Sequence, residues 1–292
     1  MTDSLEALRN RVDGAVNLQA VVRTMKALSA SSITQYENSV RALDSYYTAV
    51  EQGLIACLKQ PNALHSFAKE QDRSCPAAVI VFGSDQGLVG QFNDSLTEFV
   101  RLKLTKIGGE QKLWVVGERI HGRLQDAGLA LENCFNVPGS VEGVTPLVGE
   151  LLLATAHLWE SGIQSPLYLF HHRPGNLSGE YSPRMHQLLP LDSSWQKILQ
   201  QQPWTGMSLP ETLGTTALTL RALIREYLFV SLYQSCVESL ASENASRLIA
   251  MQRAEKNIED MLVSLRDKYH YQRQDAIDTE LFDVAAGYTA KY

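Results

Sequence analysis

The chain has 292 residues, of which 45% are hydrophobic and 20% are charged, and its formal net charge is −6. This composition can bury a core and excludes a disordered tail. The acidic balance and the absence of any Lys/Arg block argue against nucleic acid bound through phosphate contacts. No cationic signal-peptide region opens the chain and its apolar runs are too short to span a bilayer, so we expect membrane attachment only through a partner.

Proline divides the chain into three expected domains, because all ten prolines lie between Pro61 and Pro210. These are an N-terminal helix (1–60), a central α/β domain (75–192) and a C-terminal helix (211–292). In the first, apolar residues recur every three or four positions from Leu5 to Leu58, which is typical of a coiled-coil helix. The small residues at 27–32 could mark a helix end. The apolar pattern continues in phase beyond them, which favours one unbroken helix.

The central domain begins with an apolar run, Ala77–Phe82, which predicts a strand buried on both faces. A helix should follow to about Ile107, capped by Asn93 or Asp94. The further elements expected in chain order are strand 113–117, helix 118–125, a strand around Val137, a helix from Pro146 to about Glu160, strand 166–171 and an edge strand at 184–191. This alternation predicts an open, mainly parallel, Rossmann-like α/β sheet.

A glycine-rich loop lies between the first strand and its helix, where a phosphate-binding loop would be placed. The spacing of Gly83, Gly87 and Gly90 fits neither the dinucleotide fingerprint nor the phosphate-loop motif, so we interpret the glycines as a structural loop. His171 and His172 adjoin on one strand and should point to opposite faces, so they cannot share a metal. We expect no active site and no cofactor in this chain.

The four cysteines are Cys57, Cys75, Cys134 and Cys236. They form no CxxC pair and have no zinc-ligand spacing, which predicts reduced, buried thiols and no metal.

The C-terminal stretch from Thr215 to Ala286 contains neither Gly nor Pro and keeps the three-and-four apolar spacing. As a helix of about 72 residues it would reach about 108 Å, which requires a partner along its length. The economical fold wraps the two terminal helices into a long antiparallel coiled coil beside the α/β domain. The C-terminal helix is the longer, so its tip should project alone.

An ordered set of short motifs then points to a family. They are Asn17–Gln19, Arg23–Lys26, Gly83–Gly90, Gln187–Leu191, Ala241–Arg247, Met251 and Arg273–Leu281, followed by Gly287. Each motif is weak, but the whole set, in order over nearly the full chain, resembles the gamma subunit of F-type rotary ATP synthases.

The resemblance implies a non-catalytic rotor shaft. In that family the coiled coil turns inside a ring of alpha and beta subunits, and the α/β domain rests with the epsilon subunit on the membrane c-ring. Catalysis belongs to the beta subunits, whose conformations the shaft sets in turn. The expected location is the cytoplasmic face of the bacterial inner membrane, held there peripherally by partners.

The resemblance also implies two contact regions with beta. The first is Met25 with Arg23 and Lys26, which matches the family's contact with an acidic loop of beta. The second is the region gripped by beta loops around the shaft, which comprises Arg273, Gln274, Thr279 and Glu280. The alternative is that these polar residues merely solvate the helix.

Several positions depart from the family pattern. They include Val16, Ala20 and Ser32 at usual lysine positions, together with Val89, Asp278 and Tyr288. These departures suggest a divergent member, such as one of the alternate bacterial F-type complexes. The competing function is a free-standing α/β module with helical arms that binds a nucleotide or small ligand at the glycine loop.

Overall fold

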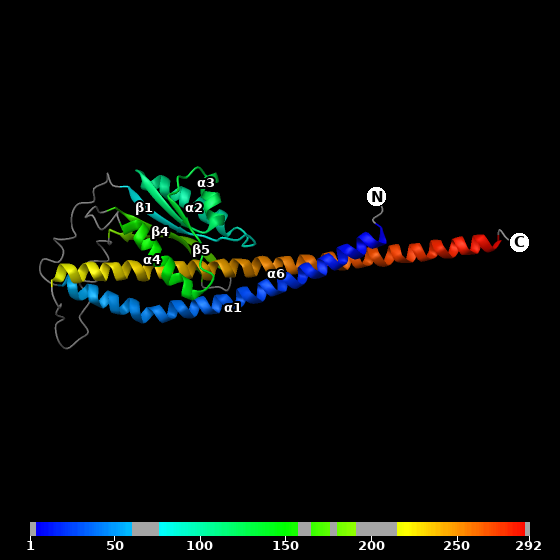
Figure 1. The fold of residues 1–292 in the computed structure, drawn as a ribbon, viewed down its shortest axis with the longest axis horizontal. Helices are drawn as coiled ribbons and strands as arrows, with labels where there is room; N and C mark the ends of the chain where they lie inside the picture. Colours follow the sequence, from blue (N-terminus) through cyan, green and yellow to red (C-terminus); the bar gives the residue numbers. More distant parts are fainter. Residues whose placement is uncertain (1–3, 60–75, 157–164, 176–179, 191–214, 290–292) are drawn as a thin grey trace. The chain divides into compact units, whose positions relative to one another are not determined.

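The computed structural model describes residues 4–59, 76–156, 165–175, 180–190 and 215–289 (Figure 1). The chain divides into two compact units, the first made of the residues up to Ser29 and from Leu248 onward, the second of Ala30–Arg247. Helices α1 (Leu5–Leu58) and α6 (Thr216–Thr289) contribute to both units. Helix α1 passes through residues 27–32 without a break, as predicted. The expected domains 1–60, 75–192 and 211–292 stay a prediction. The two compact units follow side-chain and backbone packing, and each unit contains parts of both terminal helices.

The second unit is built on one five-stranded sheet with the order β3-β2-β1-β4-β5. The strands are β1 (Ala77–Phe82), β2 (Gln111–Val116), β3 (Asn133–Phe135), β4 (Leu167–Pro174) and β5 (Tyr181–Leu189). All pairs are parallel except β4 with β5. The mainly parallel sheet and the added edge strand are therefore confirmed, and β1 is central with every residue buried.

Helices cover both faces of this sheet, which is why its strands are apolar on both sides. On one face, Val79 and Val81 pack with α2 (Phe92–Ile107) and α3 (Glu118–Asp126). On the other, Ile80 and Phe82 pack with α4 (Val144–Thr155), which follows the short 3-10 helix η2 (Val141–Gly143), and with the parts of α1 and α6 that belong to this unit. The alternation of β1 side chains thus joins two apolar cores.

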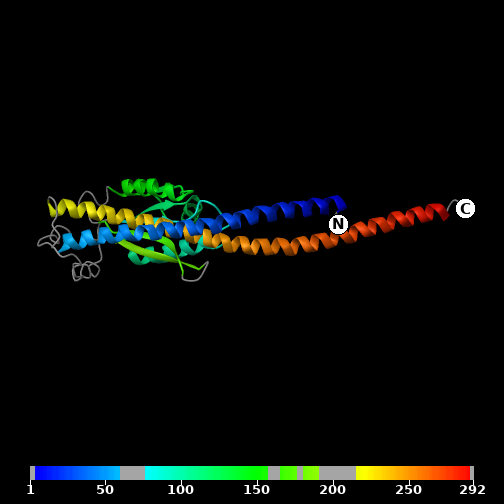
Figure 2. The same ribbon diagram turned by 90° about the horizontal axis from the view of Figure 1, so that it is seen from below.

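The two long helices run antiparallel in each unit. In the second unit the Tyr46 hydroxyl donates a hydrogen bond to the Glu226 carboxylate, 2.5 Å away, and both views show the helices side by side there (Figures 1 and 2). In the first unit, Ala15 forms a buried cluster with Ile258 and Leu262. The spacing of three or four residues between apolar positions places these side chains on the faces of α1 and α6 that contact each other, as the sequence predicts.

In the central domain the strand expected around Val137 is present but lies slightly earlier, at Asn133–Phe135, and the expected cap of α2 is wrong. Val137 lies beyond the short strand β3, and its backbone N–H donates to the Asp85 carboxylate (2.9 Å) instead of joining a strand ladder. Neither Asn93 nor Asp94 caps α2, because the helix already begins at Phe92. The Asn93 side chain instead holds the preceding loop.

The cysteines are not all buried. Cys57 and Cys236 are buried, but Cys134 is exposed because it lies on the edge strand β3. Cys75 lies outside the described residues, as do positions 157–160 of the helix expected to reach Glu160.

Candidate functional site

The first predicted contact region lies in the first unit, where two cations of α1 converge on one carboxylate of α6. The Nε of Arg23 lies 2.8 Å from Oε1 of Glu255, and the Nζ of Lys26 lies 2.5 Å from Oε2. These hydrogen bonds, that of Lys26 first, lower the pKa of the Glu255 carboxyl group. The Arg23 side chain remains 56% exposed and Met25 is half-buried. Both cations are thus partly neutralised within the chain, while part of the guanidinium still faces solvent.

The second predicted region lies on α6, beyond the seam with α1. Arg273, Gln274, Thr279 and Glu280 are all exposed. The Thr279 hydroxyl donates to the backbone carbonyl of Asp275, one turn back (2.8 Å). Within the described ranges, neither Arg273 nor Glu280 has an ion-pair partner. These charges are therefore directed at solvent.

The same stretch of α6 carries large apolar side chains that no described residue covers. Ile277, Leu281, Phe282 and Val284 are 46%, 63%, 74% and 73% exposed. Three of them recur at i, i+4 and i+7, so they form one stripe on the helix. We call these four residues the apolar tip. The family motif drew attention to polar neighbours, although the spacing itself could have identified the stripe.

The two predicted regions do not meet. Glu255, which binds Arg23 and Lys26, lies 18 positions before Arg273 on α6. At 1.5 Å per residue this separation is about 27 Å along the helix. Any partner that uses both regions must therefore contact the first unit at two levels.

In the second unit, the glycine loop after β1 is packed tightly. A Cβ added to Gly83 would lie 2.3 Å from Cγ2 of Ile120, which leaves no room for a side chain. Gly90 has φ +56°, a left-handed conformation that favours glycine. Gly87 has open space around it. The structure thus gives a physical reason for the first and last glycines and none for the middle one.

Helix α6 covers this loop with a row of serines, Ser239, Ser242 and Ser246. The hydroxyls of Ser239 and Ser246 donate hydrogen bonds to the backbone carbonyls of Phe82 (3.1 Å) and Val89 (2.6 Å), respectively. The single Ser242 hydroxyl proton lies between the carbonyls of Glu238 (2.8 Å) and His172 (3.2 Å). Nucleotides in open α/β sheets bind at the carboxyl ends of the strands. Here a helix occupies the carboxyl end of β1.

The loop's own polar groups are also engaged. The Ser84 N–H donates to Oδ1 of Asn93 (3.2 Å), and Nδ2 of Asn93 donates to the Ser84 hydroxyl (2.8 Å). Both residues are buried. A phosphate would have to displace these bonds, so the loop is not an open anion cradle.

The two adjacent histidines point to opposite faces of β4, as predicted. His171 lies 3.0 Å from the Glu238 carboxylate of α6, whereas Nε2 of His172 hydrogen-bonds the Phe92 carbonyl (2.9 Å). Burial lowers the pKa of His172 to about 4. In the described parts of the chain, no cluster of His, Cys, Asp and Glu could hold a metal ion. Nor is any described helix long and apolar enough to cross a membrane.

Comparison with known proteins decides the family. The family model described as ATP synthase matches residues 4–290. The chain belongs to the ATP synthase family. Its relatives in this family include the ATP synthase gamma chains of Chromobacterium violaceum, 26% identical over 96% of both chains, and of Salinibacter ruber, 27% identical over 97% of both. The resemblance to ATP synthase gamma subunits is thereby confirmed.

Solved ATP synthase structures contain chains of the same fold. A chain in the rotor of the Euglena gracilis mitochondrial ATP synthase has a TM-score of 0.62 at 15% identity, covering 94% of this chain and 98% of that one. A chain in the central stalk and c-ring structure of the Tetrahymena thermophila mitochondrial ATP synthase has a TM-score of 0.55 at 19% identity, covering 80% and 99%. The long helices and the mixed sheet are thus features of the ATP synthase family fold.

Proposed function

We infer that this chain is the central rotor shaft of an ATP synthase or ATPase. It couples ion-driven rotation of a membrane ring to ATP synthesis or hydrolysis on surrounding subunits. The observation that carries this inference is the family match over nearly the whole chain. The apolar tip is consistent with it, because exposed apolar surface on a single helix needs a surrounding partner.

The partners implied by this role are the alpha and beta subunits of the catalytic hexamer, the epsilon subunit and the c-ring. We propose that the chain reaches the membrane only through them, at the cytoplasmic face of a bacterial inner membrane. The chain supplies no catalytic group in this scheme. Its contribution is a surface that differs around its circumference, so that each beta subunit meets a different face as the shaft turns.

At the first contact region, Arg23, Met25 and Lys26 would meet an acidic loop of beta. Glu255 already holds both cations, so an incoming carboxylate would share them with it. The Arg23 guanidinium also lies 3.5 Å from Glu259 through Nη2, so a carboxylate of beta would compete with this weaker contact while the pair with Glu255 remains. Met25 would add an adaptable apolar contact beside the charges.

At the second contact region, loops of beta would grip Arg273, Gln274, Thr279 and Glu280. The charges directed at solvent there can form charge-assisted hydrogen bonds with a partner without first breaking an internal pair. The neighbouring apolar tip would pack against apolar side chains that line the inside of the ring of alpha and beta subunits. Polar residues then set register while the tip provides buried area.

Binding of a nucleotide at the glycine loop is the competing function. Ser246 and Asn93 already occupy the polar groups of that loop, which disfavours it. The loop is therefore assigned to holding β1, α2 and α6 together.

Purification of the tagged full chain from its host distinguishes the two functions. We expect alpha-like and beta-like chains to copurify with ATPase activity and with ATP-driven ion pumping after reconstitution. A chain shortened to end before Ile277 removes the apolar tip together with Thr279 and Glu280, and it should retain its fold but lose coupling. A monomer that binds nucleotide and carries no ATPase partners would overturn the proposal.

A further inference from the structure

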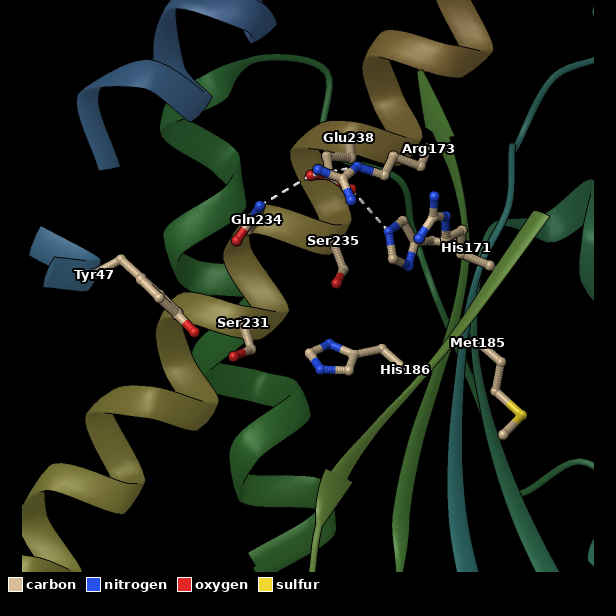
Figure 3. A pocket seen from close by; sticks show the side chains of 10 residues that line it. Tyr47, His171, Arg173, Met185, His186, Ser231, Gln234, Ser235 and Glu238 are labelled. Atoms are coloured by element: carbon tan, nitrogen blue, oxygen red, sulfur yellow. Dashed lines mark hydrogen bonds and ion pairs between the residues drawn. The ribbon is translucent and has the colours of Figure 1, made fainter. Parts of the chain in front are cut away.

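A cavity of about 270 Å³ lies within the second unit, between the β4–β5 edge of the sheet and the parts of α1 and α6 packed over it (Figure 3). Neither the glycine loop nor the proposed contact regions line it. Its inner surface is mostly polar, unlike the apolar cores on either face of the sheet. The cavity is open to solvent, because Arg173, Arg184 and His186 on its sheet side are all exposed.

Strand register gathers basic side chains on the cavity side of the sheet. In the antiparallel β4–β5 pair, His171 lies directly opposite Arg184. The two-residue period of each strand then places Arg173 on the same face as His171, and His186 on the same face as Arg184. Four basic groups therefore share one small surface, an arrangement that is unfavourable unless negative charge balances it.

Among the described residues, Glu238 is the one carboxylate that lines the cavity, and both of its oxygens are in use. Oε2 lies 3.0 Å from Nε2 of His171, while Oε1 accepts from the Gln234 amide at 2.9 Å and lies 3.6 Å from Nε of Arg173. Burial alone would raise the pKa of Glu238, but these groups together lower it. The carboxylate is thus ionised and fully engaged.

The remaining charge is not balanced. Among the described lining residues, two guanidinium groups face one carboxylate, so this part of the wall is net positive even with both imidazoles neutral. Across the described residues, Arg184 makes no ion pair and His186 no hydrogen bond to another side chain. Arg184 is exposed, and no described residue occupies its guanidinium donors, so they are accessible to a ligand that enters from solvent.

Hydroxyl and amide donors complete the wall opposite the sheet. Ser231, Gln234 and Ser235 lie on one face of α6, and the two serines are 5% and 4% exposed. Figure 3 shows the Ser235 side chain directed toward the space beside His186, whereas the Ser231 hydroxyl points away from that ring. Guanidinium, imidazole and hydroxyl donors around one space are the groups that recognise tetrahedral oxyanions.

We propose that this cavity binds a small free oxyanion of the phosphate class, with Arg184 as its principal ligand and Arg173, His186 and the Ser235 hydroxyl as supporting donors. The volume is several times the roughly 30 Å³ that one water molecule occupies in the liquid. An oxyanion with part of its hydration shell therefore fits. The inference is independent of the proposed shaft function.

Titration of the purified full chain with inorganic phosphate tests the proposal, at constant ionic strength adjusted with chloride and with binding followed by calorimetry. The wild-type chain should bind phosphate saturably. Arg184→Gln should weaken binding by about 10-fold or more, as expected for losing a charge-assisted pair. Arg184→Lys should restore part of the affinity, and unchanged thermal unfolding of both variants would exclude loss of the fold.

Arg221→Gln is the matched control, because Arg221 is exposed on α6 in the same unit and does not line the cavity. This variant should bind phosphate like the wild type. Equal weakening by Arg221→Gln and Arg184→Gln would reduce the effect to general electrostatics and overturn the proposal. Absence of saturable binding would do the same. Binding of ADP that depends on Arg184, without binding of phosphate, would identify a nucleotide phosphoryl group and refute the assignment to a free oxyanion.

Discussion

Replacing Gly83 by Ala tests whether the glycine loop serves packing. The new Cβ would lie 2.3 Å from Cγ2 and 2.4 Å from Cβ of Ile120, which is itself fully buried. These atoms lie close to the α3 backbone, so rotating the Ile120 side chain cannot relieve the overlap. The sheet and α3 must separate instead, and overpacking of this kind costs about 1–3 kcal/mol.

Gly87→Ala is the control in the same loop. A Cβ added at Gly87 would have no atom within 4 Å, and the φ of this residue lies outside the left-handed region. The same substitution should therefore be neutral or stabilise by up to about 1 kcal/mol, through the lower entropy of the unfolded chain. The two variants differ only in what the added methyl group meets.

Urea unfolding of the full chain, followed by tryptophan fluorescence, measures the difference. With a slope of about 2 kcal/mol per M, a loss of about 2 kcal/mol lowers the midpoint by about 1 M for Gly83→Ala. Gly87→Ala should leave the midpoint unchanged or raise it slightly. Equal midpoints for Gly83→Ala and the wild type would refute the packing interpretation of the loop.

Four further predictions concern the long helices. Replacing Arg273 and Gln274 together by Ala should slow ATP hydrolysis and ion pumping in reconstituted vesicles while assembly is retained, and unchanged turnover would contradict the contact assignment. Leu248→Pro should prevent assembly, because a mid-helix proline costs about 3 kcal/mol and kinks α6; a normally assembled complex would argue against a continuous helix. Lys26→Glu should lower the thermal midpoint of the chain by placing two carboxylates together. Adding Glu255→Lys should restore only part of it, because the new lysine also faces Arg23. If the losses from Lys26→Glu and Glu255→Lys simply add in the double variant, residues 26 and 255 do not interact measurably. The ion pairs in the folded chain lower the pKa of Glu255, so its ionised carboxylate stabilises the folded chain above the ordinary pKa of Glu. This stabilisation should be lost as the pH falls through the lowered pKa. Thermal unfolding midpoints measured between pH 6 and pH 3 test this.

The sequence alone determined the features that contiguous residues encode. Unbroken apolar spacing predicted both long helices, and the uniform apolar run at Ala77–Phe82 predicted a strand buried on both faces. Pro190 placed the last strand at the sheet edge. The ordered motifs led to the correct family because each can be recognised within a few neighbouring residues. Local periodicity is sufficient for such features, since helix and strand geometry depends on near neighbours.

Only the tertiary structure decided which distant side chains meet. Nothing near Lys26 in sequence indicates that Glu255 neutralises it, and nothing near Val89 indicates that Ser246 binds its carbonyl. The basic cavity likewise depends on the β4–β5 register, which places His171 opposite Arg184 and would change with a slip of one residue. The sequence contains these donors and acceptors, but only the packing of helices against the sheet determines which of them are paired and which remain open to a ligand.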